Sequence, residues 1–335
     1  MVQKLNATDF IAATLCSGTI VDVRSPSEYA LGHIVGAVNL PLFDDMQRAI
    51  VGTTYKQQGR EKAIEQGLNF VGGTLSYFVQ QGRSYGSKHL FLYCARGGMR
   101  SESMAWLLDM AGIKVSVLIG GYKAYRTHFE ELITNHPWRI NLLGGSTGSA
   151  KTSILHALAS RGEQVIDLEA IACHKGSVFG GFGQNQQPTT EHFFNLLHHE
   201  FCKLDPLQVV WCEGESMLIG HLFLPKFLFD LMYKGQYIEV YMNVEQRLDR
   251  LCIEYGHFSA DLLIEAFSKI KKRIGTEQYN LALDAIMHGH IRTAATIALK
   301  YYDKAYMNSC ITPDFRQEVD NDNIDSAIEQ LINKV

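Results

Sequence analysis

The chain has 335 residues, of which 46% are hydrophobic and 20% are charged, and its formal net charge is −4. This length suits two ordinary domains, and the composition excludes a disordered or fibrous protein. The net charge excludes a uniformly basic surface, so a nucleic acid would have to meet a local basic patch.

Targeting signals and cysteine spacing narrow the class further. The N-terminal residues lack the charged-then-apolar layout of a signal peptide, and the apolar stretch 218–232 is too short to span a bilayer. The seven cysteines form no CxxC pair, which argues against a disulfide framework or a zinc knuckle. We therefore expect a cytoplasmic protein with no membrane segment and no metal centre.

Short apolar runs alternate with helical patterns over the first 134 residues. Strands are expected at 19–23, 37–42, 89–93 and 115–118, and helices at 44–81 (broken by glycines), 101–110 and 122–133. Such alternation is typical of a parallel α/β domain, which we place at residues 1–134.

A second alternation follows a break at Asn135-His136-Pro137, the expected linker. Strands are expected at 139–143, 164–167, 208–212 and 237–242, with a helix at 151–160 and mostly helix from 244 onwards. The sequence thus predicts a second α/β domain over 135–335 with a helical C-terminal part.

The end of the strand at 89–93 carries a cysteine followed by a glycine-rich turn into a helix. The predicted sulfur-binding loop comprises Cys94, Ala95, Arg96, Gly97, Gly98, Met99 and Arg100. Backbone N–H groups and the start of a helix stabilise a thiolate, and Arg100 suits an oxyanion. A catalytic Cys94 is the favoured interpretation, and a buried structural cysteine is the alternative.

A second glycine-rich turn lies between the strand at 139–143 and the helix at 151–160. The predicted phosphate loop comprises Gly145, Ser146, Thr147, Gly148, Ser149, Ala150, Lys151 and Thr152. It nearly fits GxxxxGK[ST], in which N–H groups and the lysine hold phosphates and the hydroxyl holds a metal. Ala150 replaces the consensus glycine, which we expect to be tolerated if its φ is negative. A ligand-free turn is the alternative.

Acidic residues follow two of the strands in the second half. Asp167 and Glu169 end one strand, and Glu213, Glu215 and Ser216 end another. Carboxyl ends of parallel strands gather at the edge that carries the phosphate loop, so these residues are predicted to support it. Solvated loop charges are the alternative.

The glycine- and glutamine-rich stretch from His174 to Pro188 reads as a lid or a binding loop. Its two aromatic residues, Phe179 and Phe182, argue against simple surface flexibility.

The N-terminal half resembles the rhodanese domain. The matching segments are Asp22-Val-Arg24-Ser-Pro-Ser-Glu28-Tyr29, Gly32-His33-Ile34 and Gly36-Ala-Val-Asn39-Leu-Pro41. The resemblance implies a persulfide or perselenide on Cys94, with Arg24 in a supporting role. The Cys-x5-Arg spacing is also that of phosphatases, so a substrate larger than one sulfur atom is compatible with the loop.

The two loops together resemble the tRNA 2-selenouridine synthase family, which joins a rhodanese domain to a P-loop domain. The segments that carry this resemblance, besides the two loops, are 51–59, 120–126, 167–169, 174–177, 187–188, 213–220 and 301–306. They include His174 and cover nearly the whole chain. The hydrophobic Met217-Leu218 departs from the basic residue expected there for an anionic substrate.

The resemblance implies conversion of a wobble 2-thiouridine in tRNA to 2-selenouridine through an S-geranyl intermediate. The substrates would be geranyl diphosphate and selenophosphate, with no tightly bound cofactor and a site for Mg²⁺ at Thr152. The partners would be tRNA and the enzyme that supplies selenophosphate. A terpenoid chain needs an apolar pocket, for which Phe179, Phe182, Phe193 and the stretch 218–231 are candidates, although each also suits a core.

A basic cluster is the candidate tRNA contact. It comprises Arg247, Arg250, Lys269, Lys271, Lys272 and Arg273. A solvated helix face is the alternative for it. For the whole chain, three other functions remain open: an ATP-dependent kinase or NTPase fused to a sulfurtransferase, a phosphatase or arsenate reductase that uses Cys94 and Arg100, and a non-catalytic scaffold.

Overall fold

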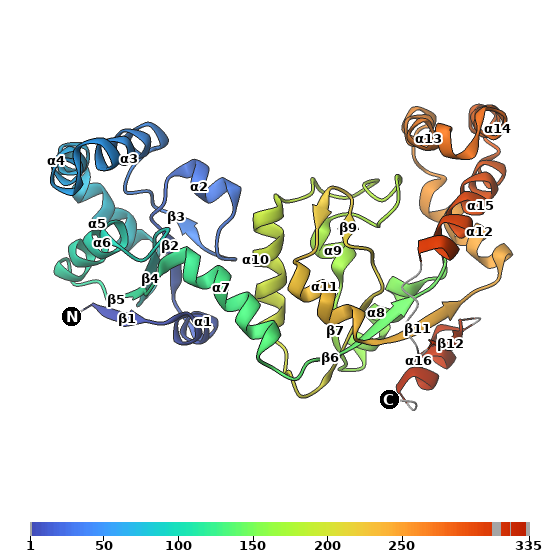
Figure 1. Cartoon of the computed structure of the whole chain (residues 1–335), viewed down its shortest axis with the longest axis horizontal. Coiled ribbons are helices and arrows are strands. Elements are labelled where there is room, and N and C mark those ends of the chain that lie inside the picture. Colours follow the sequence, from blue (N-terminus) through green and yellow to red (C-terminus); the bar gives the residue numbers. More distant parts are fainter. Residues whose placement is uncertain (1, 310–315, 322, 333–335) are drawn as a thin grey trace. The chain divides into compact units, whose positions relative to one another are not determined.

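The computed structural model describes residues 2–309, 316–321 and 323–332 (Figure 1). The chain divides into two compact units. The first contains residues 1–135 and 191–199, and the second contains 136–190 and 200–335. The division after Asn135 falls inside the predicted linker.

The first unit is built on a five-stranded parallel sheet with the strand order β1-β5-β4-β2-β3. Its strands are β1 (Gln3–Leu5), β2 (Thr19–Asp22), β3 (Val38–Asn39), β4 (Leu90–Tyr93) and β5 (Val115–Leu118). All four residues of central strand β4 are buried, as expected of an apolar run covered on both faces. The predicted strands are confirmed, β1 is an addition, and β3 is shorter than expected.

Helices cover this sheet and extend one edge of the unit (Figure 1). They are α1 (Ala7–Cys16), α2 (Pro26–Leu31), α3 (Asp45–Gln58), α4 (Arg60–Val71), α5 (Leu75–Ser84), α6 (Met99–Met110) and α7 (Gly121–Thr134), with a 3₁₀ turn at Gly72–Thr74. The segment predicted as helical with glycine breaks is thus α3 to α5, and its breaks fall at Gly59 and Gly72.

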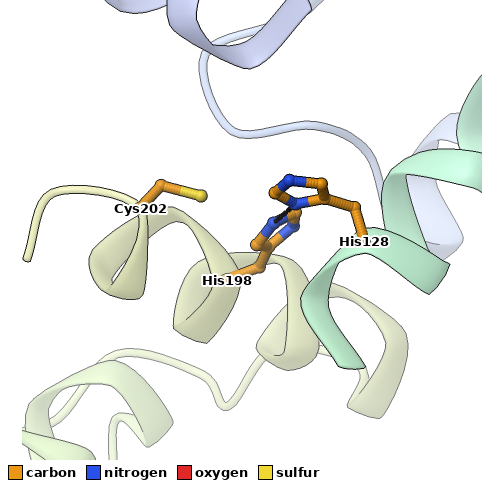
Figure 2. Close-up of side chains that lie close together, drawn as sticks. All are labelled: His128, His198 and Cys202. Atoms are coloured by element: carbon orange, nitrogen blue, oxygen red, sulfur yellow. Dashed lines mark hydrogen bonds between the residues drawn. The ribbon is translucent and has the colours of Figure 1, made fainter. Parts of the chain in front are cut away.

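Residues 191–199 of α10 (Thr190–Phe201) belong to this first unit. The Asn195 side chain donates to the Tyr122 hydroxyl at 2.6 Å, which ties α10 to α7. Figure 2 shows a second link, a 3.0 Å hydrogen bond between His128 Nδ1 and His198 Nε2. Burial, with a smaller contribution from His128, lowers the pKa of His198 to about 3, so this ring is neutral at physiological pH.

The second unit contains a five-stranded parallel sheet with the order β12-β11-β6-β8-β7. Its strands are β6 (Arg139–Gly144), β7 (Gln164–Ile166), β8 (Val209–Glu213), β11 (Gln236–Tyr241) and β12 (Arg316–Asp320). A small hairpin joins β9 (Leu218–Ile219) to β10 (Leu222–Phe223). The predicted strands are confirmed, whereas β12 and the hairpin were not expected.

Helices of the second unit fall into two groups. Those of the α/β part are α8 (Lys151–Ser160), α9 (Leu168–Ala172), α11 (Lys226–Tyr233) and α16 (Ile324–Ile332). The helical part comprises α12 (Val244–Tyr255), α13 (Ala260–Ile274), α14 (Thr276–Met287) and α15 (Ile291–Ser309). α13, α14 and α15 share a hydrophobic core that includes Phe179 from the 174–188 loop.

No helix in the described part of the chain is long and apolar enough to cross a bilayer.

Candidate functional site

The Cys94 sulfur lies at the centre of the turn between β4 and α6. The Gly98 amide donates to Sγ at 3.3 Å, and the Ser101 hydroxyl donates to it at 3.2 Å. Burial alone raises the pKa of this thiol, but hydrogen bonds from Ser101, Gly98 and Arg96 outweigh it and lower the pKa below its ordinary value. The loop therefore favours a thiolate, the reactive form of cysteine.

Glycine is required at two places where this loop meets the start of α7. Gly97 has φ +62°, and a Cβ there would lie 2.5 Å from the Gly120 nitrogen. Gly121 has φ +59°, and its Cβ would lie 2.2 Å from the Cys94 carbonyl oxygen. That close approach lets the Tyr122 amide donate to the Cys94 carbonyl at 2.8 Å, which fixes the loop against α7.

Two arginines predicted at this site are held by carboxylates. Arg100 Nη1 donates to Glu28 Oε2 at 2.6 Å, so its predicted contact with an oxyanion stays a prediction. Burial raises the pKa of Glu28, but the bond from Arg100 outweighs it and lowers that pKa. Buried Arg24 pairs with Asp22 at 2.7 Å and stacks over the Tyr122 ring at 3.9 Å, so it braces the sheet edge.

The remaining residues of the loop differ in exposure. Ala95 accepts a backbone bond from Lys123 at 3.0 Å, whereas Arg96 and Met99 are exposed. Arg96 is thus available to an incoming anion. Ser101 was absent from the predicted site, although its hydroxyl is one of the two shortest contacts to the sulfur. A serine one helical turn after the loop glycine was the sequence signal for it.

The phosphate loop joins β6 to α8 in the second unit. Gly145, Gly148 and Ala150 have φ values of +138°, +82° and +66°. The condition set for an alanine at this position, a negative φ, is not met, because Ala150 caps α8 in the left-handed conformation. A methyl group there costs about 1 kcal/mol relative to glycine, so the loop keeps its shape against a modest local strain.

The groups of this loop that would bind a phosphate are already hydrogen-bonded within the second unit. Lys151 Nζ donates to the Gly145 carbonyl at 2.8 Å, and the Gly145 amide donates to the Tyr306 hydroxyl at 2.6 Å. The Tyr306 hydroxyl also bonds to that of Tyr237. The buried Ser149 hydroxyl has no partner among the described residues, so it is available to an anion in the loop.

Arg247 corrects one of the predicted tRNA contacts. Its side chain is 5% exposed, donates through Nε to the Thr147 carbonyl at 2.8 Å, and pairs with Asp303. A guanidinium held in this way braces the phosphate loop and is not available to a nucleic acid. Arg250 contacts Ser153 at 3.0 Å and lines the cavity beside the loop.

The predicted acidic residues gather at the carboxyl ends of β7 and β8, as expected. Thr152 Oγ1 donates to Glu169 Oε2 at 3.4 Å, and the Leu168 amide donates to Glu213 Oε2 at 3.1 Å. Glu213 is fully buried, and its Oε1 has no partner among the described residues. Asp167 caps α9 through the Ala170 amide at 2.7 Å.

Burial and mutual repulsion shift two of these carboxyl groups strongly. Burial, followed by Asp167, Glu169 and Glu215, raises the pKa of Glu213 to about 9. Burial, followed by the charge of Glu215, raises the pKa of Glu169 to about 8. The negative charges of this cluster thus exceed the nearby positive charge, although Lys151 partly opposes the rise in the pKa of Glu169.

A cavity of about 680 Å³ with a mixed polar and apolar lining joins the phosphate loop to two of these carboxylates, Glu169 and Glu215. Its lining includes Lys151, Thr152, Glu169, Glu215, Ser216 and the loop residues Lys175 and Gly176. His174 accepts a bond from the Gly176 amide at 3.2 Å and so shapes this wall. A cavity of this size accommodates a diphosphate together with part of a larger substrate.

The rest of the predicted basic cluster lies on the exposed surface of α13. Lys269 pairs with Glu265, Lys271 lies over the Tyr279 ring at 4.7 Å, and Arg273 donates to the Tyr301 hydroxyl at 2.9 Å. Together with exposed Lys272, they present positive charge at the C-terminal end of this helix. Their contact with tRNA stays a prediction.

Known proteins similar to this chain share both halves of it. A family model described as the tRNA 2-selenouridine synthase AAA domain matches residues 138–323, and a model of the rhodanese-like domain matches 6–128. One solved structure, a rhodanese-like domain from an Anabaena protein, is 24% identical and covers 38% of this chain and 76% of that one, with a TM-score of 0.25.

Curated relatives match over nearly the full length. A tRNA 2-selenouridine synthase of Shewanella woodyi is 32% identical over 339 residues, which covers 89% of this chain and 90% of that protein. One of Pseudomonas putida is 34% identical and covers 91% and 92%. One of Nitrosomonas europaea is 37% identical over 256 residues and covers 74% and 66%.

Proposed function

Because the chain belongs to the tRNA 2-selenouridine synthase family, we propose that it replaces the sulfur of a tRNA 2-thiouridine with selenium through an S-geranyl intermediate. The observation that carries this proposal is the presence, on one chain, of a loop that stabilises a thiolate and a phosphate loop beside a cavity. The chain is an enzyme of this family, and the donors geranyl diphosphate and selenophosphate are the proposed part.

The first proposed step is alkylation of the thiouridine sulfur. That sulfur attacks the first carbon of the geranyl group, a C–S bond forms, the C–O bond to the diphosphate breaks, and the diphosphate leaves with the electron pair. Lys151 and the amides of the phosphate loop stabilise the leaving charge. For this, Lys151 exchanges its bond to the Gly145 carbonyl for one to the diphosphate.

The second proposed step is replacement of the geranylthio group. Selenium from selenophosphate forms a bond to C2 of the uridine, the C2–S bond breaks, and geranylthiolate leaves and takes a proton from water. We assign the release of selenium to Cys94, whose lowered pKa provides a thiolate: Sγ attacks the phosphorus of selenophosphate, the P–Se bond breaks, and selenide leaves with the electron pair to attack C2. Water then hydrolyses the S–P bond, which releases phosphate and restores the thiolate.

A divalent cation would fit the cavity of the phosphate loop. Glu169 and Glu215 face the same space as Thr152, and their repulsion disfavours an added diphosphate. Mg²⁺ prefers such oxygen ligands, and when bound it would neutralise both the carboxylates and the diphosphate. The residues that would hold it are Thr152, Glu169 and Glu215.

The tRNA surface proposed here is the exposed basic end of α13. Lys269, Lys271, Lys272 and Arg273 can neutralise phosphates of an RNA backbone, since all four side chains are exposed. Charge reversal of Lys269 and Lys272 is expected to weaken tRNA binding and to flatten its dependence on salt. An unchanged salt slope would assign these residues to a solvated helix face.

The decisive experiment incubates the full chain with a 2-thiouridine-containing tRNA and analyses the nucleosides by mass spectrometry. Geranyl diphosphate alone should give S-geranyl-2-thiouridine, and later addition of selenophosphate should give 2-selenouridine. Selenouridine formed at full rate without geranyl diphosphate would contradict the intermediate. Brisk ATP hydrolysis with no response to geranyl diphosphate would favour an NTPase fused to a sulfurtransferase.

A further inference from the structure

A narrow apolar pocket opens beside the phosphate-binding cavity, inside the second unit. It lies among α12, α13, α14 and α15, and the 174–188 loop completes its wall. Its lining is almost wholly hydrophobic and includes Phe179, Leu263, Phe267, Ile286, Ala294 and Ala298. The function described so far uses none of these side chains.

The pocket and the phosphate-binding cavity share part of their walls. The residues that line both are Thr147, Ser177, Leu251, Tyr255 and Tyr302. Thr147 belongs to the phosphate loop itself, so the boundary between the two spaces lies where a bound diphosphate would end. A single ligand that fills both must carry an anionic head and an apolar tail.

Two hydroxyls on the wall of the pocket have partners within the protein. The Ser177 hydroxyl accepts a bond from the Phe179 amide at 3.2 Å, and the Tyr302 hydroxyl accepts one from the Val178 amide at 3.1 Å. Most of the remaining lining is hydrocarbon, so burial of a polar ligand group there would cost free energy. The pocket thus favours a hydrocarbon.

Small residues of α15 keep the pocket open. Ala294 and Ala298 lie one turn apart on this helix and are 3% and 8% exposed. Phe267 and Ile286, from α13 and α14, line the pocket as large side chains. The space that remains, about 60 Å³, equals that of about two water molecules, so a longer chain needs one wall to move.

The 174–188 loop forms the wall of the pocket that no helix supplies. Gly176 and Gly183 have positive φ, and Gly180 and Gly181 follow Phe179 directly, so Phe179 is the large side chain with which this loop covers the pocket. Phe179 packs against the rings of Tyr255 and Phe267 at 5.7 and 5.5 Å. An apolar chain can replace these contacts by taking the place of one ring, which preserves burial of the core.

We infer that this pocket binds the apolar chain of the diphosphate substrate, and that Ala298 and Phe267 set the length of chain it accepts. The inference rests on the proposed function for the identity of the ligand. It assigns the apolar chain of the ligand to the helical part of the unit, where Phe179 is the one sequence-predicted candidate that lines the pocket. Phe182 and the residues of 218–231 do not line it, and Phe193 is buried in the first unit.

Binding of geranyl diphosphate and of inorganic diphosphate to the full chain tests the assignment. Ala298→Leu fills the pocket and should weaken geranyl diphosphate about tenfold or more, while inorganic diphosphate changes less than about twofold. Thr296→Leu, which puts the same leucine side chain on the same helix outside both cavities, should leave both affinities unchanged.

A second variant, which is expected to gain affinity, distinguishes a filled pocket from a folding defect in Ala298→Leu. Phe267→Leu enlarges the pocket and should improve the affinity for farnesyl diphosphate relative to geranyl diphosphate by about tenfold. If neither variant changes the relative affinities for geranyl, farnesyl and inorganic diphosphate, the pocket does not bind the apolar chain. The proposed function would still stand. If the wild-type chain binds geranyl diphosphate no more tightly than inorganic diphosphate, geranyl diphosphate is not the donor.

Discussion

Both anion-binding loops are turns from a parallel strand into a helix. They differ in whether their hydrogen-bond donors already point at the functional group. The Cys94 loop is complete as it stands, because Gly98 and Ser101 already donate to the sulfur. In the phosphate loop, Lys151 and Tyr306 bond to the loop's own Gly145. A reactive group that belongs to the protein can be prearranged, whereas a site for a diffusing ligand must first satisfy its own polar groups.

Replacement of the Cys94 sulfur should distinguish the roles of the two loops most clearly. Cys94→Ser is expected to reduce selenium incorporation by about a thousandfold or more, since it removes the reactive thiolate. Geranyl transfer should stay within about twofold of the wild-type rate, as measured by nucleoside mass spectrometry. Cys16→Ser, at an exposed cysteine, is the matched control. Loss of both activities would show that the loops do not divide the reaction.

Removal of the phosphate-loop lysine should have the converse effect. Lys151→Ala removes a charged hydrogen-bond donor and should weaken geranyl diphosphate binding about ten- to a hundredfold in calorimetry. Alkylation of Cys94 by iodoacetamide should not change. Lys226→Ala removes an exposed lysine paired with Asp230 and should change neither quantity. Unchanged binding in Lys151→Ala would remove the phosphate loop from the mechanism.

The carboxylate cluster makes the contribution of the second loop to stability fall as the pH rises. The pKa of Glu213 is raised to about 9 in the folded chain, so its contribution to stability is complete below the unfolded pKa and is lost as the pH rises towards 9. Glu213→Gln should remove a slope of up to about 1.4 kcal/mol per pH unit between pH 5 and 9 in urea denaturation.

Glu61→Gln, on an exposed helix face, is the control for that measurement and should retain the wild-type slope. The raised pKa of Glu169 adds a slope of the same sign to both proteins, so the difference between them is the quantity to compare. A slope in Glu213→Gln equal to that of the wild type would mean that Glu213 is ionised in the folded protein.

The Ser101 hydroxyl offers a finer test of the first loop. Ser101→Ala removes a donor to the Cys94 sulfur, which should raise the thiol pKa and slow iodoacetamide alkylation at neutral pH about fivefold, the equivalent of one hydrogen bond. The rates of variant and wild type should converge at high pH, where both are thiolates. Ser103→Ala, on the same helix but bonded to the Arg100 carbonyl, should leave the pH profile in place.

The smallest expected effect concerns Ala150. Ala150→Gly relieves a left-handed alanine and should stabilise the chain by up to about 1 kcal/mol in thermal or urea unfolding. Ala157→Gly, inside α8, should destabilise it by a similar amount, because glycine is unfavourable in a helix. Destabilisation by Ala150→Gly would show that the methyl group makes contacts worth more than the strain.

The sequence by itself determined the strands and helices near both loops. Buried apolar runs followed by glycine-rich turns define β4, β6 and the starts of α6 and α8, because local patterns decide local structure. The edge strand β12 escaped prediction, since its pairing with β11 depends on a partner far away in the sequence.

Only the tertiary structure decided what each charged or apolar side chain meets. Arg247 read as a tRNA contact but braces the phosphate loop through Thr147 and Asp303, which lie about 100 and 56 residues away in the sequence. Phe193 and Phe179 are both candidates for the apolar pocket in the sequence, yet only Phe179 lines it. Residue type and spacing predict the two anion sites. Contacts between residues far apart in the sequence decide which side chains surround those sites.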